Sequence, residues 1–83
     1  MKVKYFAWVR ERIGKAEETV EPPADVRTVE QLMAWLSGRG EAYAYAFEKP
    51  KVIRAAIDQS HARADAAIAG AREIAFFPPM TGG

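Results

Sequence analysis

The last eight residues combine residue types that suit chemistry at the C-terminus itself. After Glu73 the chain carries no further charged side chain, and it ends in Gly82 and Gly83. Pro78 and Pro79 favour an extended polyproline conformation, so we expect residues 78–83 to project from the domain. Seven extended residues reach about 20 Å, and glycines allow a close approach of the backbone to its surroundings. The segment therefore suits insertion into a narrow tunnel on another protein, with a frayed terminus as the alternative.

Few other side chains could perform chemistry. The chain has no cysteine, which excludes disulfides, thiolate metal sites, thiol nucleophiles and persulfide carriage. His61 is the single histidine, and one imidazole without cysteine argues against a metal site such as zinc. We interpret His61 as a surface or locally hydrogen-bonded residue rather than a catalytic one. Glu11, Glu17 and Glu18 are interpreted as solvated faces rather than paired catalytic carboxylates.

The N-terminal half predicts two strands and one helix. Residues 2–10 alternate in hydrophobicity and predict a strand, and 17–21 predict a short second strand. Thr28 and Gln31 have the spacing of a capping box, and the following apolar residues have the spacing of one buried helical stripe. The glycines of 37–40 then end the helix. They are not a phosphate loop, since no strand precedes them and no Lys-Ser/Thr follows.

The C-terminal half predicts further strands. Residues 41–47 fit either a short helix or a strand, 52–58 and 72–77 predict strands, and 59–67 predict a turn with a short excursion. The order of elements indicates an α+β fold in one small domain. The large apolar side chains expected in the core are Val3, Tyr5, Val9, Leu32, Met33, Leu36, Ile53, Ile57, Ile68, Ile74 and Phe76.

Composition limits the classes of partner. The 83 residues are 49% hydrophobic and 28% charged, and 12 Lys and Arg against 11 Asp and Glu give a net charge of +1. This balance gives no electrostatic reason to expect nucleic acid or an anionic membrane. No uncharged stretch is long enough to span a bilayer, and no signal peptide is visible. We therefore expect a cytoplasmic protein.

The C-terminal run also resembles the Phe-Phe-Pro-Pro-x-Ser/Thr-Gly-Gly ending of the small, sulfur-carrying subunits of molybdopterin synthase, in the MoaD/ThiS-type ubiquitin-like family. The resemblance extends to residues 5–11, 28–32 and 55–59 and thus covers nearly the whole chain. It implies a β-grasp fold, with a mixed sheet and one main helix packed on one face, over 1–77 and a diglycine tail over 78–83. Two positions depart from the family pattern: Asp58 stands where Asn is usual, and Gly70-Ala71 where a Gly-Asp turn is usual. Both affect loop geometry more than function.

The resemblance implies a function at the terminal carboxylate of Gly83. An ATP-dependent activating enzyme would adenylate it, and a sulfur donor would convert it to a thiocarboxylate that attacks cyclic pyranopterin monophosphate in the large subunit. Two copies of each subunit would form the synthase. Residues inserted with Gly83 would be Pro78, Pro79, Met80, Thr81 and Gly82. The chain would bind no cofactor itself, and general acids and bases would belong to the partner. A chain without cysteine carries sulfur most readily on its terminal carboxylate.

Strand parity and the resemblance together predict a docking surface. If Val3 and Tyr5 face the helix, Phe6 and Arg10 face outward, and Phe77 does so on the last strand. The resemblance places the first and last strands side by side, which would gather Phe6 and Phe77 at the base of the tail. It also places Arg10 and His61 at this surface. The alternative for either phenylalanine is ordinary surface or sheet packing, which is the interpretation that we prefer for Trp8.

Three other functions stay open. A carrier for thiamine or another thiolation pathway would share the diglycine end but usually lacks the Phe-Phe-Pro-Pro segment. A ubiquitin-like protein modifier would be attached to lysines through Gly83. A plain interaction module would make the tail incidental.

Overall fold

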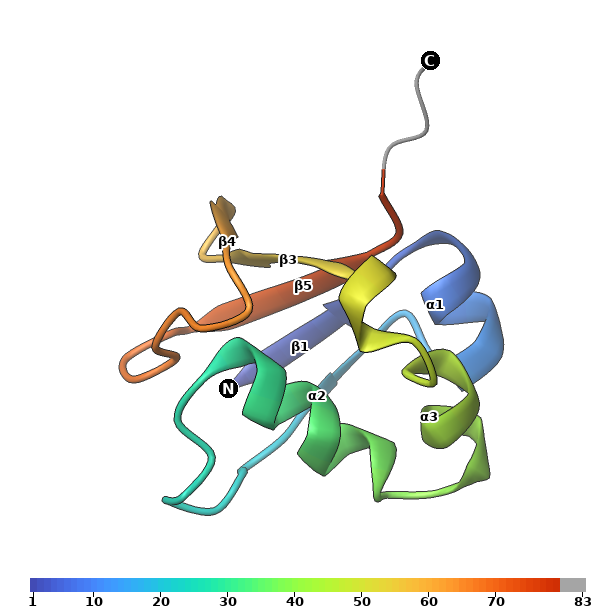
Figure 1. Ribbon diagram of the computed structural model, residues 1–83, viewed down its shortest axis with the longest axis horizontal. Helices are drawn as coiled ribbons and strands as arrows, with labels where there is room; N and C mark the ends of the chain where they lie inside the picture. Colours follow the sequence, from blue (N-terminus) through green and yellow to red (C-terminus); the bar gives the residue numbers. More distant parts are fainter. Residues whose placement is uncertain (80–83) are drawn as a thin grey trace.

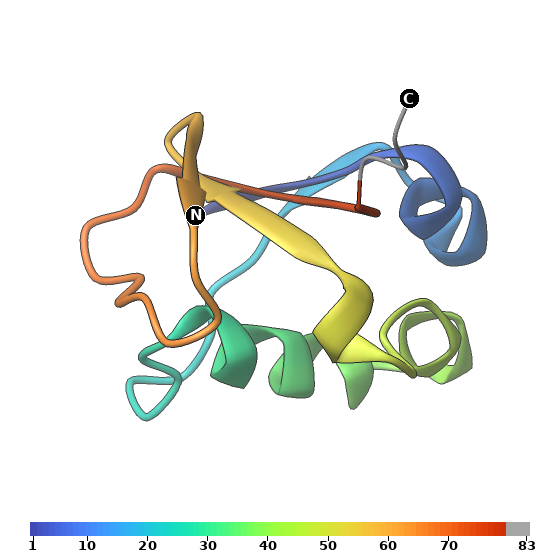
Figure 2. The same cartoon turned by 45° about the horizontal axis from the view of Figure 1, so that its top comes forward.

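A computed structural model describes residues 1–79 and shows one mixed sheet covered on one face by helices (Figures 1 and 2). The elements in chain order are β1 (Lys2–Tyr5), α1 (Ala7–Ile13), β2 (Glu17–Thr19), α2 (Val29–Ser37), α3 (Glu41–Ala46), the 3-10 helix η1 (Pro50–Val52), β3 (Arg54–Ile57), β4 (Ser60–Ala62) and β5 (Glu73–Phe77). The strand order is β2-β1-β5-β3-β4. Only β1 and β5 are parallel among these pairs. The predicted α+β class is confirmed, as is the prediction that the first and last strands are neighbours.

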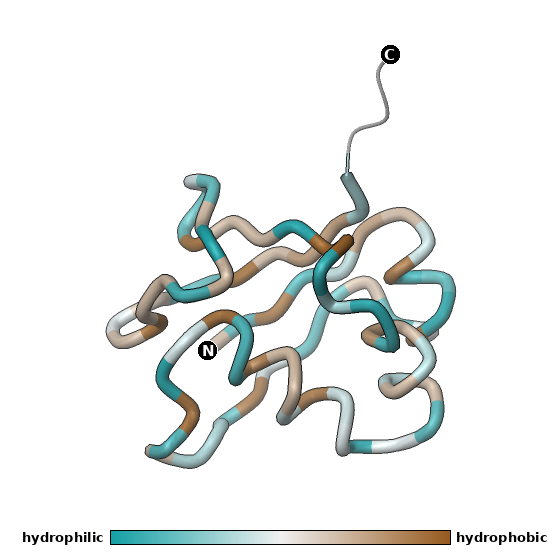
Figure 3. Tube along the Cα trace, viewed as in Figure 1, coloured by the Kyte–Doolittle hydropathy of each residue, from teal (hydrophilic) through white to brown (hydrophobic). Residues whose placement is uncertain are grey.

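Helix α2 begins and ends where the sequence predicts. The Thr28 hydroxyl accepts a hydrogen bond from the Gln31 amide at 3.3 Å, and the Gln31 side chain accepts one from the Thr28 amide at 3.2 Å. Val29, Leu32, Met33 and Leu36 are buried against the sheet. The alternation of hydrophobic and hydrophilic residues along α2 and β1 is visible in Figure 3. The helix therefore forms from a local cap and one apolar stripe.

The predicted strand over 2–10 is wrong beyond Tyr5. The chain turns at Ala7, whose φ of 52° lies in the left-handed region, and enters α1. Val9 is buried as expected, but on a helix, where it shares one face with Ile13. Gly14, with a φ of 87°, ends α1 and donates its N–H to the Arg10 carbonyl at 2.7 Å. Short apolar runs fit both the two-residue period of a strand and the 3.6-residue period of a helix. Here the helical spacing of Val9 and Ile13 agrees with the structure.

Ala7 adopts a conformation that glycine adopts at lower cost, which gives a testable prediction. We expect Ala7→Gly to raise the free energy of unfolding by about 0.5 to 1 kcal/mol, because relief of left-handed strain exceeds the added entropy of the unfolded chain. Chemical denaturation measures it. Gly14→Ala is the matched control and should lower stability, since Gly14 has a positive φ as well. An unchanged or lower stability of Ala7→Gly would contradict the assigned strain.

The core lies between the sheet and α2, with α1 and α3 closing one end. Ten of the predicted core side chains are buried, and Ile57 is only half-buried because it lies near the end of β3. The segment 41–47, for which two structures stayed open, forms helix α3. Phe47 directly follows α3. Its ring lies edge-on to the rings of Phe76 and Tyr5, with centroid distances of 5.3 Å and 6.4 Å. These aromatic contacts hold the end of β5 against the end of β1. The C-terminal segment begins directly after β5.

The turn from β3 to β4 uses Asp58, one of the two departures from the family pattern. Asp58 and Gln59 have φ values of 48° and 72°. The Asp58 carboxylate accepts hydrogen bonds from the amides of Arg72 and Glu73, both at 3.0 Å. Asp58 thus joins the β3–β4 turn to the start of β5. Gly70, which precedes the other departure at Ala71, has a φ of 78° in the loop before β5.

Candidate functional site

The candidate site is the end of the sheet where β5 stops. Phe77 is the last residue of β5, and Pro78 and Pro79 follow it half-buried. Prolines have no N–H to donate, so strand pairing ends there. The chain leaves the sheet beside η1 and the start of α1 (Figure 1). Met80, Thr81, Gly82 and Gly83, which carry the predicted chemistry, lie outside the described residues.

Phe6 lies at this end of the sheet and faces outward, as strand parity predicts. It is the residue between β1 and α1, and its amide donates to the Phe76 carbonyl at 3.0 Å, which places its backbone beside the end of β5. Its side chain is 45% exposed. Its backbone is extended, with φ of −127° and ψ of 154°, so it continues the alternation of β1 and points away from the core in which Val3 and Tyr5 lie. Arg10 lies one helical turn further, exposed on α1, where its amide donates to the Phe6 carbonyl at 3.3 Å.

Phe77 and His61 contact each other on the face of the sheet away from α2. Their ring centroids are 5.7 Å apart and the rings are nearly perpendicular, at 81°. His61 is on β4, opposite Ala56, and the small Ala56 side chain on β3 leaves room for the imidazole to reach Phe77. The structure therefore brings together two residues that the sequence separates by 16 positions.

Arg54 was missed as a site residue. It is the first residue of β3, exposed, and directly opposite Phe77 in the antiparallel pair. Alternation along the predicted strand over 52–58 could have found it, since Arg54 must face away from the buried Ile53 and Ala55. Val52 in η1 is also 40% exposed and was not selected.

Trp8 is not part of this surface, as the sequence interpretation preferred. It is half-buried and packs on the core and against Arg12. The Arg12 guanidinium carbon lies 4.6 Å from the Trp8 ring centroid and 4.0 Å from that of Tyr45. Arg12 also donates to the Tyr45 carbonyl at 3.1 Å. This stack joins α1 to α3.

Glu18 is the centre of a separate polar cluster. Its carboxylate accepts hydrogen bonds from the hydroxyls of Tyr5 at 2.8 Å and Tyr43 at 2.7 Å. Lys15 and Arg39 form ion pairs with it at 3.4 Å and 3.3 Å. Burial alone would raise the pKa of Glu18, but the hydrogen bonds and the two cations outweigh it and hold that pKa below its usual value. Burial and the bond to Glu18 raise the pKa of Tyr5. The cluster joins β1, β2 and α3, so we assign it to stability.

The Glu18 cluster predicts an acid-dependent loss of stability. The folded-state pKa is lowered, so this contribution is complete above the unfolded pKa of about 4.3 and disappears as pH falls through the folded value. We expect Glu18→Gln to lose about 1 to 3 kcal/mol of unfolding free energy at neutral pH. The loss should shrink at low pH. Glu17→Gln, on the same strand but exposed, is the control. Denaturation at several pH values measures both, and equal effects would contradict the assignment.

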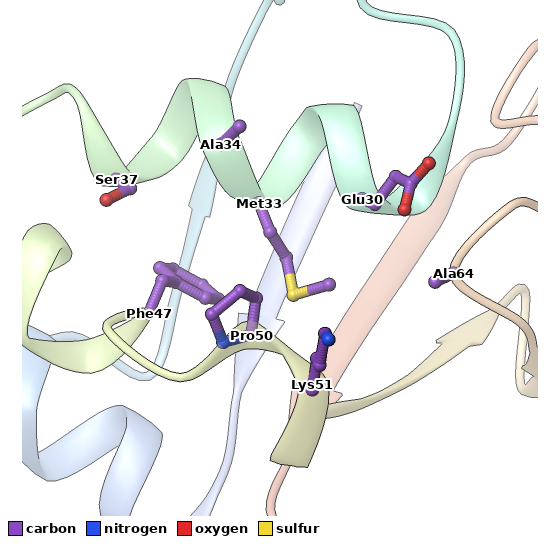
Figure 4. A pocket seen from close by; sticks show the side chains of 8 residues that line it. All are labelled: Glu30, Met33, Ala34, Ser37, Phe47, Pro50, Lys51 and Ala64. Atoms are coloured by element: carbon purple, nitrogen blue, oxygen red, sulfur yellow. The ribbon is translucent and has the colours of Figure 1, made fainter.

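A pocket of about 390 Å³ lies between α2 and η1 and contains none of the predicted site residues (Figure 4). Its lining includes the buried Met33 and Phe47, with Glu30 and Lys51 as its charged residues. Within residues 1–79 no group of three acidic, histidine or cysteine side chains could hold a metal ion. Over the same residues no helix is long and apolar enough to cross a bilayer.

The chain is similar to known proteins over its whole length, including the residues after Pro79. Residues 3–83 match the model of the ThiS family. The chain is 39% identical over 83 residues to the molybdopterin synthase sulfur carrier subunit of Escherichia coli, covering 100% of this chain and 99% of that one. It is 37% identical, with the same coverage, to the subunit of that name from Haemophilus influenzae.

Two solved structures share the fold. SAMP1 from Haloferax volcanii superposes with a TM-score of 0.73 at 27% identity, covering 100% of this chain and 98% of that one. A putative molybdopterin converting factor, subunit 1, from Pyrococcus furiosus has a TM-score of 0.73 at 25% identity and covers 94% of both chains. The β-grasp fold predicted from the resemblance is confirmed.

Proposed function

The chain belongs to the ThiS family, and on that basis we propose that it is the sulfur-carrier subunit of a molybdopterin synthase. The observation that carries this proposal is the extent of the similarity, since two bacterial carrier subunits match over the full 83 residues. The family match also includes the terminal glycines. The absence of cysteine agrees with a carrier that holds sulfur on its C-terminal carboxylate.

The proposed chemistry takes place at Gly83. A carboxylate is a poor electrophile because resonance and hydration stabilise it. The Gly83 carboxylate would attack the α-phosphorus of ATP on an activating enzyme, release pyrophosphate and form an acyl-adenylate. A sulfur donor would then displace AMP and leave a thiocarboxylate. The thiocarboxylate sulfur would attack a carbon of cyclic pyranopterin monophosphate in the large subunit and form a thioester as an oxygen substituent leaves that carbon. Hydrolysis of the thioester would leave the sulfur on the substrate and return the Gly83 carboxylate.

The folded domain would contribute position rather than acid–base catalysis. Phe77 fixes the start of the tail in the sheet, where it pairs with β3 and contacts His61. Pro78 and Pro79 restrict the backbone conformation of the chain directly after β5. Phe6, Arg10, Phe77 and His61 would meet the partner at the base of the tail. The acids and bases would come from the large subunit.

The proposed function requires two protein partners. One is the large subunit, in an assembly with two copies of each subunit. The other would be an adenylating enzyme that uses ATP. We expect this chain to stimulate release of pyrophosphate from ATP by the activating enzyme of its own organism, and to co-purify with the large subunit. If the chain neither stimulates pyrophosphate release nor co-purifies with the large subunit under native conditions, the proposal is contradicted.

A further inference from the structure

We propose that Arg54 and Arg10 flank the aromatic base of the tail as two anchors for carboxylates, and that the docking surface of the large subunit is acidic where it surrounds this base. The inference rests on the proposed function and adds the chemistry of the partner's surface. Arg54 carries the new assignment, because strand pairing places it directly opposite Phe77.

Arg10 and Arg54 are among the six of twelve cations that form no ion pair in residues 1–79, and the other four are Arg27, Lys49, Lys51 and Arg72. Ion pairs within 4.0 Å engage Lys2, Lys4, Arg12, Lys15, Arg39 and Arg63. Within residues 1–79, Arg10 and Arg54 have no ion-pair partner, and both are exposed. The Arg54 guanidinium donates only a long hydrogen bond, 3.5 Å, to the Lys51 carbonyl. Glu11 places one negative charge next to Arg10 in the sequence, and Lys51, exposed in η1, adds a positive charge beside Arg54.

The two arginines lie on opposite sides of the last strand. Arg10 approaches from α1, which follows β1, and Arg54 belongs to β3 on the other side of β5 (Figure 1). Between them lie Phe6 and Phe77 at the end of the sheet. A partner that receives the tail therefore meets both guanidinium groups, one on each side.

The sheet face beside Arg54 allows close approach. Ala75 is buried and Ala56 half-buried, and both lie on the same face as Phe77 and His61 because they alternate with core residues. Because these side chains are small, the sheet surface beside the Phe77 and His61 rings does not block the approach of a partner. A partner segment lying here would contact Phe77 and bring a carboxylate within reach of the Arg54 side chain.

The chemistry favours a protein with carboxylates over a polyanion. Guanidinium groups bind carboxylates through paired hydrogen bonds. Lys2 and Lys4, the lysines of β1 on this sheet face, already form ion pairs with Glu17 and Glu73. Two separated arginines around an aromatic centre resemble a protein interface, with an apolar core and a charged rim, whereas nucleic acid requires a continuous basic track.

Charge reversal tests the proposal. We expect Arg54→Glu and Arg10→Glu each to slow association with the purified large subunit by about 10-fold at low ionic strength. The double variant should be slower still and should lose most of the salt dependence of the association rate constant. Arg54→Lys keeps the charge, so it should retain the association rate and dissociate faster. Arg72→Glu is the matched control, because Arg72 is exposed and unpaired in the described chain but precedes β5 at its opposite end.

The possible outcomes separate this inference from the function beneath it. If the unmodified chain binds and both reversals bind like Arg72→Glu, the acidic docking surface is wrong and the carrier function stands. If Arg54→Glu binds faster, the partner surface is basic and the proposal is overturned. If the unmodified chain does not bind the large subunit at all, both the inference and the proposed function fail. Circular dichroism and thermal unfolding establish that each variant is folded.

Discussion

Deletion of Gly83 is expected to abolish sulfur transfer while leaving association with the large subunit nearly unchanged. The shortened chain still ends in a carboxylate, but that group is withdrawn by about 3.3 Å, more than a reacting geometry tolerates. The surface at the base of the tail is untouched. Single-turnover transfer from chain loaded with sulfur, and affinity measured by calorimetry, give the two results separately.

Two matched variants make the Gly83 result specific. Adding one alanine after Gly83 keeps every native residue but displaces the terminal carboxylate and gives it a side chain, so transfer should be lost again. Met80→Leu keeps the length, the charge and the terminal group of the tail, so transfer should persist. Normal transfer by the chain without Gly83 would refute the assignment of the reactive carboxylate to that residue.

Placing a charge on the aromatic base of the tail is expected to have the second large effect. We expect Phe6→Asp and Phe77→Asp each to weaken binding to the large subunit by about 100-fold, or about 3 kcal/mol, since aromatic residues at the centre of an interface contribute most of its binding energy. Phe6 is 45% exposed, so its replacement should leave stability almost unchanged. Titration calorimetry or surface plasmon resonance measures the affinity.

Tyr45→Ser is the control for an exposed aromatic residue away from the tail. Tyr45 is 53% exposed on α3, and its loss removes the stacking on Arg12 but nothing at the end of β5. Binding by Tyr45→Ser should equal that of the unmodified chain. Equal binding by the two phenylalanine variants, with their folding confirmed, would show that the partner docks elsewhere.

Local signals in the sequence predicted α2 well and residues 6–13 poorly. The Thr28–Gln31 cap is a contact between residues three apart, so it can be recognised before the fold is known. Residues 2–10 carry an apolar residue at every second position, and Ile13 completes a helical pair with Val9 only after the chain has turned. The turn itself occurs at Ala7, a residue type that rarely takes a positive φ, so nothing local announces it.

The candidate site depended on contacts that no local pattern contains. Phe77 meets His61 only because β4 folds back through the turn at Asp58 and Gln59 and because Ala56 is small. Family resemblance placed His61 near this surface, but the ring contact required the tertiary structure. Alternation with Ile53 and Ala55 places Arg54 on the outer face, but its position opposite Phe77 follows only from the pairing of β3 with β5, which no local pattern contains.

The most direct test of the central claim is the intact mass of the chain isolated from its own cells. The account predicts a population heavier by the difference between one sulfur and one oxygen atom, with that difference confined to the C-terminal fragment containing Gly83. The heavier population should disappear when the activating enzyme is removed. A chain that never carries sulfur at Gly83, or that instead is found as a ladder of conjugates with other proteins, would contradict it.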